Sequence, residues 1–281
     1  MQQTIKRYWP LFLIIPTLLA VGALWDLPLS QLLYQPQSML GLVMECFGFF
    51  PLYLPLIFLC ISYGKNPRCK APLRVLLPVI GAAGWGALWY VGLHHLMKRN
   101  ALSPSQTPML LALILAGLLL GAMCILPILR APTATVKKLQ FLFWVGSVYM
   151  VLNNLLINLC KLLWQRTRFD DMLRAGSFAD FTPWYLPLGN GGSSFPSGHT
   201  AAACAVFVLL SACALFARWR GRERLVCALC WAYVALMGAG RILIGRHFLS
   251  DTVVAALLGF LLYLWMCKTP IYQKALQKAL E

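Results

Sequence analysis

Eight long apolar runs limit the folds that this chain of 281 residues can adopt. Each run is close to the roughly 20 residues that an α-helix needs to cross the hydrocarbon core of a bilayer. Helices are expected, because a strand or loop facing lipid would leave backbone hydrogen-bonding groups unsatisfied. The runs cover residues 9–25, 39–63, 75–97, 108–129, 139–160, 199–217, 225–244 and 248–267.

The composition of the chain is that of a membrane protein. Hydrophobic residues make up 60% of the sequence and charged residues 11%, and the mean hydropathy is +0.72. A soluble domain would need a far more polar surface. We therefore predict the all-α class, as a polytopic bundle of about eight transmembrane helices. The second run carries Pro51 and Pro55, which would kink it or split it into two shorter helices.

The distribution of cationic residues predicts the orientation in the membrane, because Lys and Arg accumulate in cytoplasmic loops. With the N-terminus inside, two thirds of the 24 Lys and Arg residues fall in inner segments, and both termini are cytoplasmic. The formal net charge of +16 is dispersed over several short inner segments. This dispersal fits contact with anionic headgroups and argues against a nucleic-acid partner, so the lipid bilayer is the expected partner.

Three groups of polar and ionisable residues lie at the outer ends of the runs under this topology. They are Lys161 with Arg168 after the fifth run, Pro196-Ser197-Gly198-His199 at the start of the sixth, and Arg241, His247 and Asp251 around the turn between the seventh and eighth. A charged residue at the edge of an apolar run must either be well solvated or have a functional role. The three groups together predict a phosphate site on the outer face.

The first group is the weakest of the three. Lys161 and Arg168 are seven residues apart, close to two helical turns, so on a continuing helix they would project from one side and clamp an anion together. Taken alone, the pair is better explained by a snorkelling lysine and a loop arginine at the membrane edge.

The second group has the composition of a helix start that binds an anion. Ser194 can cap the helix, and Pro196 suits its first turn. Gly198 lets a ligand approach backbone N–H groups at the positively polarised helix end, and Ser197 adds a hydroxyl donor. His199 can give or take a proton near neutral pH. An ordinary helix start with one interfacial histidine is the alternative interpretation.

The third group supplies a nucleophile. His247 and Asp251 are four residues apart, so Asp251 can accept the proton of one ring nitrogen and leave the other nitrogen unprotonated. Arg241 would lie on a different side of an unbroken helix, but Gly245 offers a break between the two runs. A structural His–Asp hydrogen bond beside a solvated Arg241 stays open as an alternative.

Taken together, the order and spacing of these residues resemble the type 2 phosphatidic acid phosphatases (PAP2), which share a site with vanadium haloperoxidases and glucose-6-phosphatase. The family pattern is Lys, six residues, Arg-Pro; then Pro-Ser-Gly-His; then Ser-Arg, five residues, His, three residues, Asp. The chain keeps these spacings with two departures, since Phe169 replaces the proline and Gly240 replaces the serine. Neither is a principal catalytic group, although losing the serine would remove one hydrogen bond to phosphate.

The resemblance implies a division of the chain. The third to eighth runs, within residues 71–281, would form the six-helix catalytic core of the family. The first two runs, within residues 1–70, would be an accessory pair, and because they are even in number they leave the site on the outer face.

The resemblance also implies a role for each site residue. His247 would attack phosphorus and form a phosphohistidine, Asp251 would orient it, and His199 would protonate the leaving oxygen and then activate water. The equatorial phosphate oxygens would be held by Lys161, Arg168, Arg241, Ser197 and the backbone of Gly198. No metal and no cofactor is expected, since three cations supply the positive charge.

A site at the membrane edge favours a lipid phosphate or diphosphate as substrate. Polyprenyl diphosphate, phosphatidic acid and phosphatidylglycerol phosphate all fit. We expect a lipid phosphatase in a bacterial plasma membrane, with its site on the non-cytoplasmic side. Two alternatives stay open: phosphoryl transfer to another lipid, and a transporter with incidental motifs. Glu45, within the second run, marks a functional cavity or is an uncharged, hydrogen-bonded residue.

Overall fold

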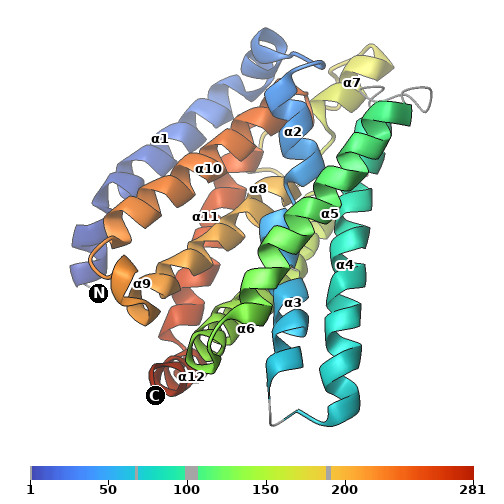
Figure 1. Ribbon diagram of the computed structural model, residues 1–281. Coiled ribbons are helices and arrows are strands. Elements are labelled where there is room, and N and C mark those ends of the chain that lie inside the picture. The colour runs from blue at the N-terminus through green and yellow to red at the C-terminus, as the bar shows by residue number, and fades with distance from the viewer. Residues whose placement is uncertain (1, 67–68, 99–106, 188–190) are drawn as a thin grey trace. The chain divides into compact units, whose positions relative to one another are not determined.

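The computed structural model describes residues 2–66, 69–98, 107–187 and 191–281, and in these ranges all regular structure is helical (Figure 1). The predicted all-α class is confirmed. Eight helical segments in the described ranges are long and apolar enough to cross a membrane, one for each predicted run. They are Leu13–Leu33, Met39–Lys65, Ala71–Lys98, Thr107–Arg130, Thr133–Ala175, Gly198–Leu215, Glu223–Leu243 and Leu249–Lys268. The chain is an integral membrane protein.

The described chain forms two compact units. The first comprises the residues up to Met44, Leu152–Cys204 and Trp231–Leu262, and the second comprises Glu45–Val151, Ala205–Cys230 and Tyr263–Glu281. The first unit holds α1 (Gln2–Leu33), most of α2 (Met39–Phe47), the end of α6 (Thr133–Trp164), α7 (Phe169–Ala175), α8 (Gly198–Ala203), and much of α10 (Glu223–Leu243) and α11 (Leu249–Lys268). All eight predicted site residues belong to this unit.

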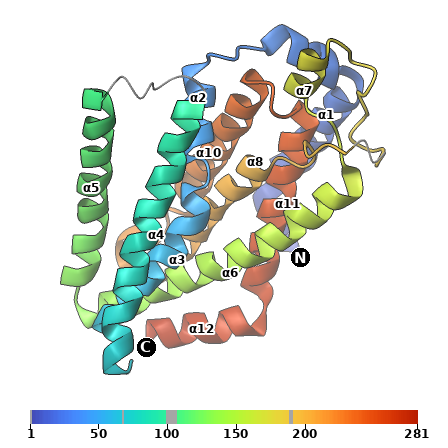
Figure 2. The same ribbon diagram turned by 90° about the vertical axis from the view of Figure 1, so that its right-hand side faces the viewer.

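The second unit holds the remaining parts of the shared helices and several helices of its own. These are α3 (Phe50–Ser62), α4 (Ala71–Lys98), α5 (Thr107–Arg130), α9 (Ala212–Leu215) and α12 (Pro270–Leu280), with the 3₁₀ segments η1 (Tyr63–Lys65), η3 (Ala217–Trp219) and nearly all of η2 (Cys204–Ser211). Its helices α3 and α4 lie side by side (Figure 2). Trp85 of α4 donates from Nε1 to the carbonyl oxygen of Gly117 in α5 at 3.0 Å, which gives the indole a partner in an apolar setting.

The second apolar run is split, as its prolines suggested. Helix α2 ends at Phe47 and α3 begins at Phe50, with Pro51 in its first turn. Proline is tolerated there, because an N–H group in the first turn has no intrahelical partner in any case. Pro55 stays inside α3, and Glu45 of α2 is buried.

Helices α1 and α2 pack directly on the elements that carry the third motif. A Cβ added at Gly22 of α1 would lie 2.9 Å from Cβ of Ser250 at the start of α11. Past the end of α1, the backbone N–H of Gln35 donates to the carbonyl oxygen of Leu243, the last residue of α10, at 2.6 Å. Only glycine permits the first of these approaches, so α1 is fitted closely to α11 within the first unit.

Candidate active site

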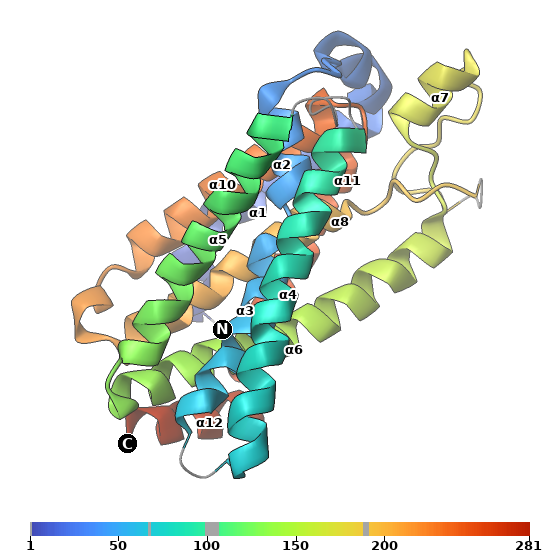
Figure 3. The ribbon, with the colours of Figure 1, turned by 45° about the vertical axis from the view of Figure 1, so that its right-hand side comes forward.

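The first motif straddles a sharp turn at the end of α6. The helix ends at Trp164, and Gln165 adopts the left-handed conformation with φ of +46°. The chain then runs extended to Arg168, which is the N-cap residue of the short α7 (Figure 3). Lys161 and Arg168 therefore do not share a helical face, because the helix does not continue between them. Instead Arg168 Nη2 donates to Ser193 Oγ at 2.8 Å, beside the second motif.

The second motif forms the start of α8, with a different cap from the one predicted. Ser197, not Ser194, is the N-cap residue, and its Oγ accepts hydrogen bonds from Thr200 N at 3.4 Å and Thr200 Oγ1 at 2.9 Å. The hydroxyl of Ser194 is engaged elsewhere, where it donates to the carboxylate of Asp251. Gly198 opens the helix, and a Cβ added there would lie 3.4 Å from Nζ of Lys161. The lysine ammonium thus reaches the Gly198 backbone.

The third motif straddles the turn between α10 and α11. Arg241 lies in the last turn of α10, Asp251 lies in the first turn of α11, and His247 lies between the two helices. The predicted break at Gly245 is confirmed, since its φ is +72°, a conformation that favours glycine. All three motif side chains are buried. The backbone N–H of Ser197 donates to the carbonyl oxygen of Asp251 at 3.0 Å, which joins the second motif to the third.

The ring of His247 is oriented by a backbone carbonyl. Its Nδ1 lies 2.7 Å from the carbonyl oxygen of Ser194 and 3.8 Å from Oδ2 of Asp251. The hydrogen bond predicted between Asp251 and the ring is therefore replaced by one to Ser194, because 3.8 Å is too long for such a bond. A carbonyl oxygen only accepts, so Nδ1 carries the proton and Nε2 of the neutral ring carries the lone pair.

The environment of His247 also favours its neutral form. Burial lowers the pKa of His247 from its ordinary value of 6.5 to about 4, and the positive charges of Arg241 and Lys161 act in the same direction. The carboxylate of Asp251 opposes them by favouring the protonated ring. The balance leaves an unprotonated nitrogen at neutral pH.

Asp251 is held by a set of donors that the sequence did not suggest. Oδ1 accepts from Arg166 Nη1 at 2.6 Å, and Oδ2 accepts from the backbone N–H of Phe248 at 2.9 Å and from the hydroxyl of Ser194. With several donors on both oxygens, the carboxylate has one well-defined orientation. It lies beside the His247 ring as a fixed negative charge.

Arg166 and Asp26 also belong to this cluster, although neither was predicted as a site residue from the sequence. Arg166 is almost fully buried, and its Nη2 lies 3.0 Å from Oδ2 of Asp26 in α1. Asp26 Oδ1 also accepts from the backbone N–H of Ser250 at 3.0 Å, and the Ser250 hydroxyl donates to Asp26 Oδ2. The Phe248 ring centroid lies 4.2 Å from the Arg166 guanidinium carbon, which adds a cation–π contact. The available signal in the sequence was the position of Arg166 between Lys161 and Arg168. Nothing in the spacing indicated that its partner would be Asp26, 140 residues away.

The two departures from the family pattern have structural reasons. Phe169, in place of proline, is buried, and its ring packs on Tyr34 and Phe178 at centroid distances of 5.4 and 5.6 Å. At Gly240, in place of serine, an added Cβ would lie 3.0 Å from Cβ of Met44 in α2. The close packing of α2 thus leaves no room for a larger residue without a shift.

The cations of the three motifs act on one another. Arg168, Arg241 and Asp251 lie close enough to Lys161 for their charges to interact with its ammonium group. His199, the second residue of α8, is partly exposed. In the part of the chain that the structure describes, no group of three or more His, Cys, Asp and Glu side chains is placed to hold a metal ion. The positive charges of Arg241 and Lys161 therefore lie close to a neutral histidine.

These features define a helical membrane protein with a histidine and several cations at one site. The model of the PAP2 superfamily matches residues 142–274, a range that contains all eight predicted site residues. This segment of the chain is similar to the PAP2 superfamily. No curated protein and no solved structure matches the chain. Asp26 lies outside the matched range.

Proposed function

We propose that this protein is a lipid phosphatase that hydrolyses a lipid phosphate or diphosphate through a phosphohistidine. The match of residues 142–274 to the PAP2 superfamily supports phosphatase-type chemistry. The observation that carries the proposal is the state of His247, whose Nδ1 is hydrogen-bonded to the Ser194 carbonyl at 2.7 Å. This bond presents Nε2 as a nucleophile among cations that suit a phosphate.

In the first step, the lone pair of His247 Nε2 forms a bond to phosphorus. The bond from phosphorus to the leaving oxygen breaks, and His199 gives that oxygen a proton. In the second step His199 takes a proton from water, whose oxygen attacks phosphorus as the P–N bond breaks. The products are the dephosphorylated lipid and inorganic phosphate, and both histidines return to their initial states.

The charge that spreads over the equatorial oxygens is balanced by the motif cations. Lys161, Arg168 and Arg241 would contact these oxygens, and the N–H groups at the start of α8 are reached past Gly198, which has no side chain to obstruct them. Ser197 Oγ accepts two hydrogen bonds from Thr200, so its own proton remains for a phosphate oxygen. These contacts strengthen as negative charge develops in the transition state.

Asp251 acts on the positive charge that the ring acquires. When Nε2 bonds to phosphorus, the ring keeps the Nδ1 proton and becomes cationic, and the carboxylate 3.8 Å away stabilises it. Arg166 and Asp26 are positioning residues in this proposal, because they act through Asp251. A carboxylate without its guanidinium partner would turn away from the ring or draw in water.

The site residues lie at the ends of membrane spans or just beyond them, which supports a lipid as substrate. Polyprenyl diphosphate, phosphatidic acid and phosphatidylglycerol phosphate have the required phosphate, and the bilayer delivers each of them to the span ends. The cation distribution of the sequence supports an outer, non-cytoplasmic face.

An assay with the purified protein tests the proposal. The three lipids are each incubated with the protein in ¹⁸O-labelled water, and the phosphate released is analysed for ¹⁸O. Label in free phosphate is expected, together with a phosphoenzyme that His247→Ala cannot form. Label-free phosphate attached to a second lipid would identify a phosphotransferase instead. If no lipid loses phosphate and no phosphoenzyme forms, the enzymatic proposal is wrong and the transporter alternative gains support.

A further inference from the structure

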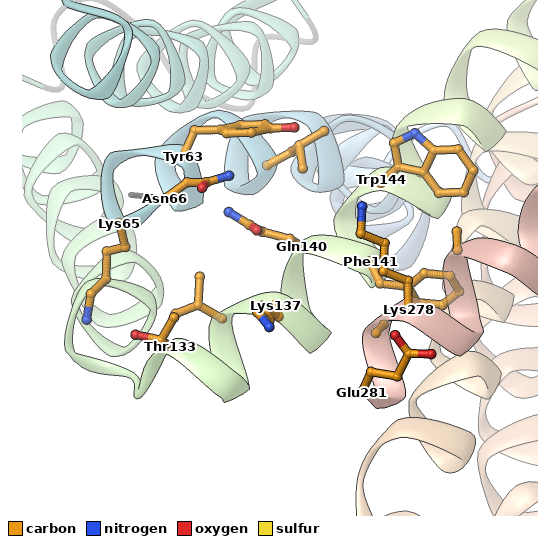
Figure 4. Close-up of a pocket in the computed structure, with 14 residues that line it drawn as sticks. Tyr63, Lys65, Asn66, Thr133, Lys137, Gln140, Phe141, Trp144, Lys278 and Glu281 are labelled. Carbon is orange, nitrogen blue, oxygen red and sulfur yellow. The ribbon is translucent and has the colours of Figure 1, made fainter. Parts of the chain in front are cut away.

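A cavity of about 600 Å³ lies in the second unit, between α3, α6 and α12 (Figure 4). Its lining combines apolar and cationic side chains. Leu59, Val136 and Trp144 are among the apolar residues, and Lys65, Lys137 and Lys278 are the cations. None of the predicted catalytic residues lines it. The cavity therefore needs an explanation of its own.

The walls of the cavity are fixed by contacts within the second unit. Helix α12 is capped by Thr269, whose hydroxyl oxygen accepts from the backbone N–H of Tyr272. The Tyr272 hydroxyl is hydrogen-bonded to Ser211 Oγ at 2.8 Å, and its ring packs edge-on against Phe141 at 5.3 Å between centroids. Gln140 of α6 donates from Nε2 to the carbonyl oxygen of Ser62 in α3 at 3.2 Å. A cavity with anchored walls can bind a ligand at little cost in ordering.

The charge of the lining selects for an anion. Three lysines face one acidic residue, Glu281, so the cavity carries an excess of positive charge. Lys65 Nζ donates to the carbonyl oxygen of Ala131 at 2.8 Å, which holds that ammonium beside the start of α6. Figure 4 shows the three lysines on three different elements around one opening.

The position of these lysines along the spans indicates the source of the anion. Lys65 ends one span, Lys137 lies in the first turns of another, and Lys278 follows the last span. When spans alternate in direction, these three points share one face, which the cation distribution assigns to the cytoplasm. That leaflet holds anionic lipids, and basic pockets between helices there bind their headgroups.

We propose that this cavity binds an anionic phospholipid, with its phosphate at Lys137 and Lys278 and an acyl chain along Leu59, Val136 and Trp144. The apolar part of the lining distinguishes a lipid from a soluble phosphate, which would leave those side chains without a partner. The proposal does not depend on the phosphatase reaction. It adds a second lipid site, which binds its ligand without chemistry.

The test compares two double variants with the same loss of charge on the same helices. Lys137→Gln with Lys278→Gln removes two cavity lysines, and Lys138→Gln with Lys274→Gln removes two neighbours outside the cavity. Each full-length protein, in neutral detergent, is titrated with phosphatidylglycerol or phosphatidylcholine of identical acyl chains, and bound lipid is counted by native mass spectrometry. We expect phosphatidylglycerol binding to weaken on the order of tenfold in the cavity variant only.

Three results would overturn the proposal. Equal losses in both double variants would indicate general surface charge, and equal binding of both lipids would exclude headgroup recognition. Competition by inorganic phosphate as strong as by the whole lipid would indicate a soluble-anion site. A third variant, Ala275→Phe, fills the apolar part without changing charge and should also reduce lipid binding. An unchanged thermal unfolding temperature in every variant shows that the fold is intact.

Discussion

Arg166 Nη2 lies 3.0 Å from Asp26 Oδ2, so the first helix supplies a counter-charge to the residue that also holds Asp251. The same guanidinium reaches Asp251 Oδ1 at 2.6 Å through Nη1. Burying two carboxylates around one guanidinium is costly unless all are satisfied by hydrogen bonds. Both carboxylates accept several, but the buried Nε of Arg166 has no hydrogen-bond partner among the described residues. Such an arrangement is more readily explained by positioning than by stability.

We expect Asp26→Asn to lower kcat by roughly 10-fold to 100-fold with little change in KM, because it leaves substrate contacts intact and weakens the hold on Asp251. The amide oxygen can still accept from Ser250 N, so the fold should survive. Asp171→Asn, which removes an exposed carboxylate paired with Arg174, is the matched control and should be neutral. Equal kinetics in the two variants would show that Asp26 has no part in the reaction.

Substitution of the two histidines should affect the reaction in different ways. His247→Ala should remove both turnover and the phosphoenzyme, while His199→Ala should retain more activity on an activated aryl phosphate, which needs little protonation of its leaving group. Asp251→Asn should fall between them, with a loss of up to about 10⁴-fold. Rapid-quench trapping on the three variants checks this. A phosphoenzyme that persists in His247→Ala but vanishes in His199→Ala would reverse the roles.

Activity should survive chelation and be blocked by vanadate. Lys161, Arg168 and Arg241 provide the positive charge in the proposed mechanism, and vanadate mimics pentavalent phosphorus bound to His247. Turnover is measured with and without EDTA and over a vanadate titration. Loss of activity with chelator that added magnesium restores would contradict the mechanism.

The orientation in the membrane can be measured by cysteine labelling. In a cysteine-free variant, a cysteine at Leu186, which is 42% exposed in the loop before α8, should react with an impermeant reagent on intact cells. A cysteine at Lys274 of α12 should react only after lysis, because the cation distribution places it inside. The opposite pattern would place the proposed site on the cytoplasmic face.

Stability should fall as the pH is lowered from about 6.5 to about 4. The pKa of His247 is lowered in the folded protein. Over this pH window the histidine is therefore protonated in the unfolded chain but neutral in the folded protein. The contribution of His247 is complete above the unfolded pKa and is lost as pH falls through the folded pKa, by up to roughly 3 kcal/mol. Thermal unfolding in mild detergent measures it. His247→Gln should show a shallower dependence, and identical slopes would show that His247 does not titrate in this way.

The spans could be predicted from the sequence, because an apolar run is a local feature. The prediction ended the first run at Trp25, since a charge follows, whereas the structural span continues to Leu33. The helix can continue because Asp26 is neutralised by Arg166. A partner so distant in sequence leaves no local pattern.

The orientation of the His247 ring could not be predicted from the sequence, for a different reason. The i,i+4 spacing suggested Asp251 as acceptor, but the ring bonds to the carbonyl oxygen of Ser194. Every residue has a carbonyl, so residue type gives no sign of which one accepts. The same limit applies to the N-cap of α8. Ser194 was predicted as the cap, but Ser197 is the N-cap residue in the structure.

The salt bridge between Asp26 and Arg166 has a consequence for the order in which the site forms during synthesis of the chain. Asp26 of α1 is synthesised before Arg166, so its carboxyl group has no guanidinium partner until the fifth span has been made. Ser250 and Asp251 follow later still, at the start of the eighth span. The charge cluster is therefore complete only after the eighth span has been synthesised, and a chain that stops short of residue 250 leaves Asp26 and Arg166 without Ser250 and Asp251.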